Sequence, residues 1–253
     1  MKKTLLMLAA AAALFAACKP GTPDDPDNPG NPGNDPQENN APIVIDGVFD
    51  DWAALDAAKV AVAKNTPNSP WTYARSMRVY ADASHIYYFI EFDKQELAEL
   101  MEEVKGDNGL PMRVNLNIDG EFTTGYTNYS LDGYDYIIEG SLAENGKWTS
   151  FDGTLHEWGW REAKSDYGWN EVLAYGSGLT WGAGEGNKYE LAVDRKVFNR
   201  VEKLAEPKKI PDTFQTGLRF YTPGWGEMAN LPNASVSDHE QGWAHLLEIK
   251  TNK

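Results

Sequence analysis

The feature that most constrains the fold is a series of short segments in which hydrophobic and polar residues alternate. In residues 112–118 (MRVNLNI) every second side chain is hydrophobic, and those between are Arg and Asn. A period of two residues places alternate side chains on opposite faces of a β-strand. We therefore predict a strand here with one covered face. Asp119-Gly120, which directly follow this segment, are typical of a β-hairpin turn.

Other segments rich in β-branched and aromatic residues predict further strands. Residues 86–92 (IYYFIEF) predict a strand with both faces mostly covered, which a turn at 82–85 joins to a strand at 77–80. The remaining predicted strands are 43–45, 60–63, 134–139, 155–161, 189–193, 218–221 and 245–249.

Two segments predict short helices. Residues 97–104 carry hydrophobic residues at helical spacing, with Asp93 and Glu96 as a capping pair in front. Residues 197–204 follow Asp194, a predicted N-cap. Many strands with one or two short helices favour an all-β fold, a two-sheet antiparallel β-sandwich of the immunoglobulin or jelly-roll kind.

The N-terminal residues predict a signal peptide over residues 1–17. Lys2 and Lys3 precede an apolar run that is shorter than the roughly 20 residues of a membrane-spanning helix. Small residues then stand directly before Cys18, the one cysteine of the chain, and this pattern resembles the lipobox of bacterial lipoproteins. The resemblance implies lipidation of Cys18. The alternative is an ordinary signal peptide with an incidental cysteine.

Residues 18–41 are expected to be a disordered tether in front of a domain at 42–253. They are rich in Pro, Asn and Asp and cannot bury a core. At about 3.1 Å per residue an extended tether would reach roughly 70 Å. Lys19, Asp24 and Asp25 loosely resemble the acidic export tag of Bacteroidetes surface lipoproteins. This implies a lipid anchor in the outer membrane, with the domain on the extracellular side.

Composition excludes several classes of function. The chain has 23 Lys and Arg against 38 Asp and Glu, a net charge of −15, so nucleic acid is not an expected partner. A single cysteine excludes an intrachain disulfide and a Cys-ligated zinc site. Aromatic residues at 12% and hydrophobic residues at 42% are too many for a disordered chain.

Four motifs, in order, resemble family 9 carbohydrate-binding modules. The motifs are 43–52 (IVIDGVFDDW), 78–90 with a D-x-x-x-I-Y turn, 117–126 with N-I-D-G and T-G-Y, and 189–193 (YELAV). The resemblance spans roughly 43–249. It implies a two-sheet β-sandwich shared with DOMON domains and an extracellular role. Sugar binding is frequent in that family, and calcium is sometimes bound.

Sugar binding requires aromatic rings that stack on sugar C–H faces, each contact contributing about 0.5–1.5 kcal/mol. Trp residues in turn-rich loops are candidates, because loops at sandwich ends commonly carry function. Two Trp at i, i+2 would share one strand face as a stacking platform. Packing against the protein is the alternative for each, and Trp52 is assigned to the core. The candidates are Trp71, Trp169, Trp181 and Trp225 in loops, and Trp158 and Trp160 in a strand.

Calcium is the metal that the sequence leaves open. The acidic residues concerned are Asp46, Asp50, Asp51, Asp132 and Asp135. They do not match a calcium-loop motif, and capping of turns is the alternative. The four His lack the spacing of a zinc hydrolase. A DOMON-like haem would need a His with Met101 or Met112, and nothing singles out such a pair.

No catalytic motif is found, and we expect no enzyme. Residues 182–186 (GAGEG) lack the Lys and helix of a phosphate-binding loop and are predicted to be a turn. We expect a cell-surface lipoprotein whose sandwich binds a polysaccharide or glycoconjugate. The alternative is a structural, adhesion or accessory protein without a sugar ligand, with other outer-membrane lipoproteins or a transporter as partners.

Overall fold

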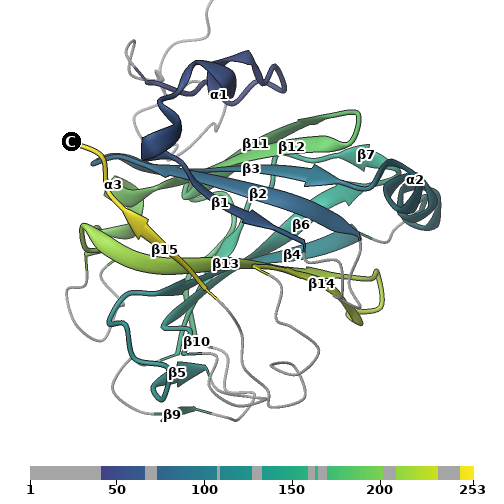
Figure 1. Ribbon diagram of the computed structural model, residues 1–253. Coiled ribbons are helices and arrows are strands. Elements are labelled where there is room, and N and C mark those ends of the chain that lie inside the picture. The colour runs from purple at the N-terminus through teal and green to yellow at the C-terminus, as the bar shows by residue number, and fades with distance from the viewer. Residues whose placement is uncertain are drawn as a thin grey trace, which may run out of the picture. The chain divides into compact units, whose positions relative to one another are not determined.

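The computed structural model describes residues 41–65, 73–106, 109–126, 133–158, 163–164, 170–201, 209–232 and 246–253. All of them belong to one of the two compact units of the chain, Pro32–Lys253. They form two antiparallel sheets with three short helices, which confirms the predicted β-sandwich. Figure 1 shows the two sheets as separate layers.

Sheet A has five strands in the order β1-β2-β3-β12-β11. Asp82 closes the predicted turn between β2 and β3, because its carboxylate accepts from the backbone N–H groups of Ser84 (2.7 Å) and His85 (2.8 Å). The strands are β1 (Ala61–Lys64), β2 (Ala74–Ala81), β3 (His85–Phe92), β12 (Lys188–Asp194) and β11 (Thr180–Glu185).

Sheet B follows the order β10-β8-β6-β4-β13-β14, and in addition β15 pairs with β13 and β7 with β6. The strands are β4 (Gly109–Asn117), β6 (Tyr136–Glu144), β7 (Lys147–Trp148), β8 (Thr154–Glu157), β10 (Asn170–Leu173), β13 (Thr213–Tyr221), β14 (Glu227–Leu231) and β15 (Leu247–Lys250). A separate parallel pair is formed by β5 (Gly125–Tyr126) and β9 (Ala163–Lys164).

The helices are α1 (Asp50–Ala54), α2 (Lys94–Glu103) and α3 (Arg195–Phe198), and Ala57–Lys59 form a 3-10 turn. Asp93 and Asp194 are confirmed as N-caps, but Glu96 does not complete a capping pair, because the Asp93 N–H donates to the Tyr73 carbonyl (2.8 Å). Asp93 accepts from two backbone N–H groups at the start of α2, and Asp194 does the same for α3.

The main core lies between the sheets. Alternate side chains of each strand point into it, as in Met112, Val114 and Leu116 of β4, all fully buried. The Tyr88 hydroxyl of sheet A meets the Thr216 hydroxyl of sheet B at 2.8 Å, so this buried polar pair is satisfied. The alternation that the sequence showed in 112–118 therefore sets which face of β4 is inside.

The N-terminal segment 41–56 covers the outer face of sheet A. Ile43 and Trp52 pack there on Tyr87 and Phe89 in a second buried cluster. Figure 1 shows this segment, coloured purple, on the side of sheet A that faces away from sheet B. Trp52 is 4% exposed, which confirms its assignment to a core.

Three local predictions were wrong. Residues 43–45 are not a strand; the backbone N–H of Val44 binds the Asp51 carboxylate instead of another strand. Residues 182–185 belong to strand β11, which pairs with β12, rather than to a turn, and the Trp148 ring occupies the space where Gly184 lacks a side chain. Asp119-Gly120 do turn the chain, but β4 pairs with β6 and β13, not with an adjacent hairpin partner.

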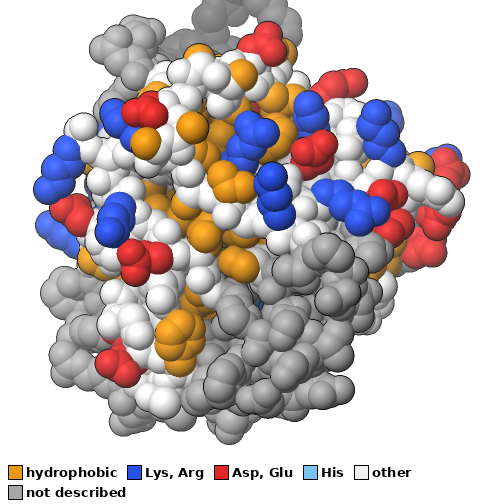
Figure 2. Space-filling view, viewed as in Figure 1, with side chains coloured by type: hydrophobic (Ala, Val, Ile, Leu, Met, Phe, Trp, Pro, Cys, Tyr) orange, Lys and Arg blue, Asp and Glu red, His pale blue; other side chains and the backbone are white. Residues whose placement is uncertain are grey.

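Single apolar side chains are exposed at several places, including Val48 and Val62. Figure 2 shows exposed hydrophobic side chains on one face of the molecule, with Lys, Arg, Asp and Glu interspersed among them. Scattered apolar side chains of this kind are ordinary for a protein surface and do not mark a site by themselves.

Candidate functional site

The structure describes three of the six predicted aromatic site residues. Trp158, Trp181 and Trp225 lie within it, whereas Trp71, Trp160 and Trp169 lie outside the described residues. Cys18 and Asp132 also lie outside them.

Trp158, the residue that directly follows β8 in the sequence, is fully buried. Its ring packs edge-on against Tyr126, with 4.8 Å between ring centroids, in a small cluster on sheet B. A buried ring offers no face to a ligand, so Trp158 has the structural role that the sequence left as its alternative.

Trp181 lies in strand β11, not in a loop. Its ring contacts His85 in a T-shaped arrangement, with 5.4 Å between centroids, and packs against the cluster beneath the N-terminal segment. Trp181 is therefore half-buried and helps to hold the cover of sheet A.

Trp225 is the described tryptophan that is open to solvent, with 48% of its surface exposed. It occupies the turn between β13 and β14, where its backbone N–H donates to the Thr222 carbonyl (2.8 Å) and the Gly226 N–H donates to Thr222 Oγ1 (3.0 Å). Its φ is +64°, a left-handed conformation that costs a bulky residue about 1–3 kcal/mol. The turn thus holds an exposed indole in a strained backbone position.

Tyr221 and Arg113 lie beside this indole. The Tyr221 ring centroid is 5.6 Å from that of Trp225. The Arg113 guanidinium lies 4.7 Å from the Tyr221 ring centroid and 5.3 Å from the Trp225 ring centroid. Arg113 Nη1 donates to the Tyr221 hydroxyl at 3.0 Å, and its Nε donates to the Glu139 carboxylate at 2.6 Å.

Strand register explains this grouping. Arg113 of β4 is paired with Glu139 of β6 on one side and Arg219 of β13 on the other. Side chains two residues apart share a face, so Tyr221 stands beside Arg219. We call this surface the outer face of sheet B. It comprises Arg113, Asn115, Glu139, Arg219, Tyr221 and Asn230.

The outer face of sheet B also carries two carboxamide side chains, those of Asn115 and Asn230. Asn115 is 1% exposed, and neither polar atom of its amide has a hydrogen-bond partner. Gly217, its cross-strand neighbour, contributes no side chain. Asn230 Nδ2 donates to Glu227 at 2.8 Å, and its Oδ1 has no partner. Buried amides without protein partners are costly and are commonly satisfied by ordered water.

The face combines both signs of charge. Arg219 lies 5.2 Å from the Tyr134 ring centroid and 4.0 Å from the Glu227 carboxylate. Burial raises the pKa of the Tyr221 hydroxyl, against the effect of Arg219 and Arg113, so this phenol stays neutral. Burial also lowers the pKa of His156, which keeps that imidazole neutral at pH 7. The face therefore offers neutral donors and acceptors between paired charges.

Three of the acidic residues considered for calcium, Asp46, Asp51 and Asp135, accept hydrogen bonds from the backbone. Asp46 Oδ1 accepts from the N–H of Val48 (2.8 Å), and Asp51 accepts from those of Val44 (2.6 Å) and Trp52 (2.8 Å). Asp135 accepts from the N–H of Ile118 (2.6 Å). Within the described ranges, no group of three or more His, Cys, Asp or Glu is placed to hold a metal. In the same ranges, no helix is both long and apolar enough to cross a membrane.

Sequence reasoning identified Trp225 from its Pro-Gly-Trp-Gly turn but missed Arg113, Glu139 and Tyr221. A signal for Arg113 was present, because it occupies a polar position of the alternating segment 112–118. Nothing in the sequence alone joined that strand to residues more than a hundred positions away. Comparison with protein-family models and with curated proteins finds no match for this chain.

Proposed function

We propose that this domain binds carbohydrate without catalysis, on the outer face of sheet B, with Trp225 as the stacking ring. The observation that carries the proposal is the half-exposed Trp225 indole, held at φ +64° beside Tyr221 and the Arg113–Glu139 pair. An exposed aromatic ring next to fixed polar groups is the combination that sugar recognition requires.

The chemistry of the neighbours supports a sugar. A sugar ring presents a C–H face that packs on an indole and hydroxyls that donate and accept hydrogen bonds. Beside the Trp225 ring, the partly exposed Arg113–Glu139 pair presents a charged donor group and a charged acceptor group. Such a site is already organised before binding, which lowers the entropic cost of association.

The arrangement of the carboxylates supports binding rather than hydrolysis. A glycoside hydrolase needs two carboxyl groups directed at one scissile bond. Here Glu139 is bound to Arg113 and Glu227 to Asn230, so these two carboxylates are engaged by protein neighbours.

The proposed setting is a lipid-anchored protein on the outside of the outer membrane. Its support is the lipobox-like sequence at Cys18, the tether at 18–41 and the resemblance to family 9 carbohydrate-binding modules. Many copies on one surface would bind a polysaccharide by avidity, so weak individual sites would be sufficient.

The test is binding of the full chain to an array of plant, host and microbial glycans, with and without calcium. Trp225→Ala should lower the affinity for any glycan bound by about tenfold, the equivalent of about 1.4 kcal/mol. Val62→Ala is the matched control, since Val62 has the same 48% exposure and lies on sheet A.

Two results would oppose the proposal. Absence of binding across the whole array would favour the structural or adhesion alternative. Binding that Trp225→Ala leaves unchanged would place the site elsewhere on the protein.

A further inference from the structure

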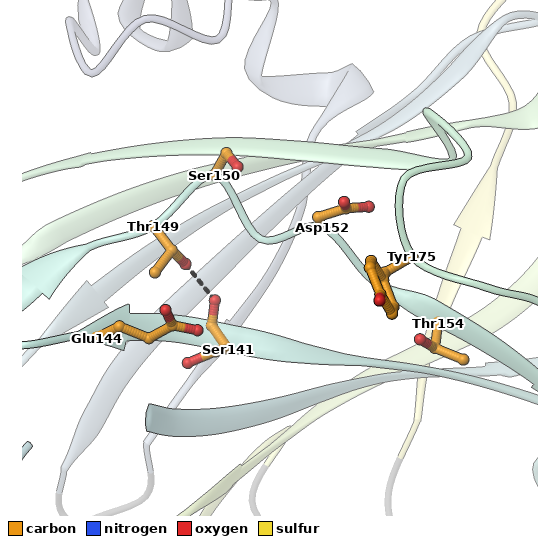
Figure 3. A pocket seen from close by; sticks show the side chains of 7 residues that line it. All are labelled: Ser141, Glu144, Thr149, Ser150, Asp152, Thr154 and Tyr175. Atoms are coloured by element: carbon orange, nitrogen blue, oxygen red, sulfur yellow. Dashed lines mark hydrogen bonds between the residues drawn. The ribbon is translucent and has the colours of Figure 1, made fainter. Parts of the chain in front are cut away.

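A cavity of about 370 Å³ opens beside strands β6 and β8. Figure 3 shows its lining, with Glu144 toward one end and the Tyr175 ring toward the other. Much of the wall consists of the hydroxyl groups of Ser141, Thr149, Ser150 and Thr154. Tyr175 is 76% exposed, so one face of its ring is open to a ligand.

The loop that forms one wall, residues 149–153, is firmly held by sheet A. The Tyr189 hydroxyl donates to the Thr149 carbonyl at 2.7 Å. Thr180 Oγ1 donates to the Phe151 carbonyl at 2.7 Å and accepts from the Gly153 N–H at 2.8 Å. Phe151 is fully buried and has φ +48°, so it is a second bulky residue with a left-handed backbone conformation. The cavity wall is therefore fixed before any ligand arrives.

The charged residues that line the cavity are all acidic. Glu144 and Asp152 line it, and no Lys or Arg is among its lining residues. Asp152 is held in place, because both of its oxygens accept from the Gly176 N–H, at 2.8 and 2.7 Å. The two lining carboxylates disfavour an anionic ligand such as a uronate, whereas they accept hydrogen bonds from neutral hydroxyls.

The cavity lies next to the outer face of sheet B. Thr154 in its wall is the cross-strand partner of Glu139, which binds Arg113. Ser141 stands two residues from Glu139 on the same side of β6. With neighbouring strands about 4.8 Å apart, the path from β13 across β4 and β6 to β8 is roughly 14 Å. That span exceeds one sugar ring.

We propose that the cavity is a second sugar subsite, and that the ligand is a linear, uncharged glycan of several units that crosses the strands from Trp225 to Tyr175. This inference rests on the proposed function and adds the length and charge of the ligand to it. Tyr175 supplies the stacking ring of the second subsite, and Glu144 and Asp152 select against acidic sugars.

The test uses the full chain and glucan, mannan and xylan oligosaccharides of one to six units, with oligogalacturonates of the same lengths as charged probes. The wild type should bind the six-unit neutral chains more tightly than the single sugars. Tyr175→Ala should lower the affinity for six-unit chains by about three- to tenfold and leave that for single sugars unchanged. Trp225→Ala should lower both, and Val62→Ala neither. The pair Glu144→Gln and Asp152→Asn should improve binding of oligogalacturonate.

The outcomes separate the two proposals. If single sugars and six-unit chains bind Tyr175→Ala as they bind the wild type, the second subsite is wrong while the Trp225 site stands. Oligogalacturonate bound by the wild type as tightly as the neutral chains would overturn the charge selection. If the wild type binds none of the probes or arrayed glycans, the proposed function fails and this inference fails with it.

Discussion

The indole Nε1 of Trp52 donates a hydrogen bond of 3.0 Å to Oε2 of Glu190, 138 positions further along the chain. The other carboxylate oxygen, Oε1, accepts from the N–H groups of Asp46 (2.9 Å) and Gly47 (2.7 Å). Gly47 has φ +82°, a conformation that glycine adopts without strain. A single buried carboxylate of β12 thus holds the N-terminal segment on sheet A.

Glu190→Ala should destabilise the fold by about 3 kcal/mol. Glu190 is fully buried, and its loss leaves two backbone N–H groups and the Trp52 indole N–H without their acceptor. Urea unfolding followed by Trp fluorescence would measure the loss. Glu185→Ala is the control, since Glu185 is an exposed acid on the adjacent strand, and it should change stability by less than about 0.5 kcal/mol. Equal effects in the two variants would contradict the role of Glu190.

The same carboxylate should make stability depend on pH. Burial raises the pKa of Glu190 above its ordinary value of 4.5, although the hydrogen bonds from Gly47, Asp46 and Trp52 act against this. The folded state therefore binds the proton more tightly than the unfolded state, so this group's contribution falls as pH rises from about 4.5 through the raised pKa. Urea unfolding from pH 4 to 7 should show the wild type losing stability relative to Glu190→Gln. A constant difference between them would mean that the pKa is not raised.

Gly184→Ala should destabilise the fold by about 1–3 kcal/mol. A Cβ atom at Gly184 would lie 2.5 Å from the Trp148 ring, which is packed between Phe92 and Tyr189 and has little room to move. At Gly224 the nearest atom to an added Cβ is 3.8 Å away, so Gly224→Ala is the matched control. Thermal unfolding of the two variants would test this, and similar melting temperatures would show that Trp148 can adjust.

The left-handed backbone at Trp225 predicts an order of stability among its variants. Ala would keep a side chain at φ +64°, whereas Gly adopts that φ freely. Trp225→Gly should therefore be more stable than Trp225→Ala by about 0.5–1 kcal/mol, although both remove the same indole. Chemical denaturation of both proteins measures the difference. An Ala variant at least as stable as the Gly variant would argue against the left-handed turn.

Strand positions were predictable from the sequence wherever a residue pattern repeated locally. β3 and β12 combine β-branched and aromatic residues, and both fall where they were predicted. Strand β11 was not predicted, because a segment with several glycines is typical of a turn. In the structure the rings of Trp148 and Tyr189 pack against these glycines, and the sequence alone does not show this. The segment 43–45 is hydrophobic enough for a strand, but the N–H group of Val44 binds the Asp51 side chain, and those of Asp46 and Gly47, directly after the segment, bind Glu190. The local pattern does not reveal these contacts.

The candidate site was predictable in part for the same reason. Trp225 has a local signal, an aromatic residue between two glycines behind a proline. Its neighbours Tyr221 and Arg113 are 108 positions apart and meet only because β4 pairs with β13. The cavity beside Tyr175 likewise depends on the pairing of β6 with β8. Such long-range pairings follow from the whole fold.

The N-terminal segment covers sheet A and not sheet B, so the two sheets differ in how they are connected to the start of the described chain. The first described residues lie on the outer face of sheet A, where Ile43 and Trp52 are buried, whereas Trp225 lies in the turn between β13 and β14 of sheet B. A force applied to the chain at Ala41 would therefore load the Glu190 hydrogen bonds before the strand pairing of sheet B.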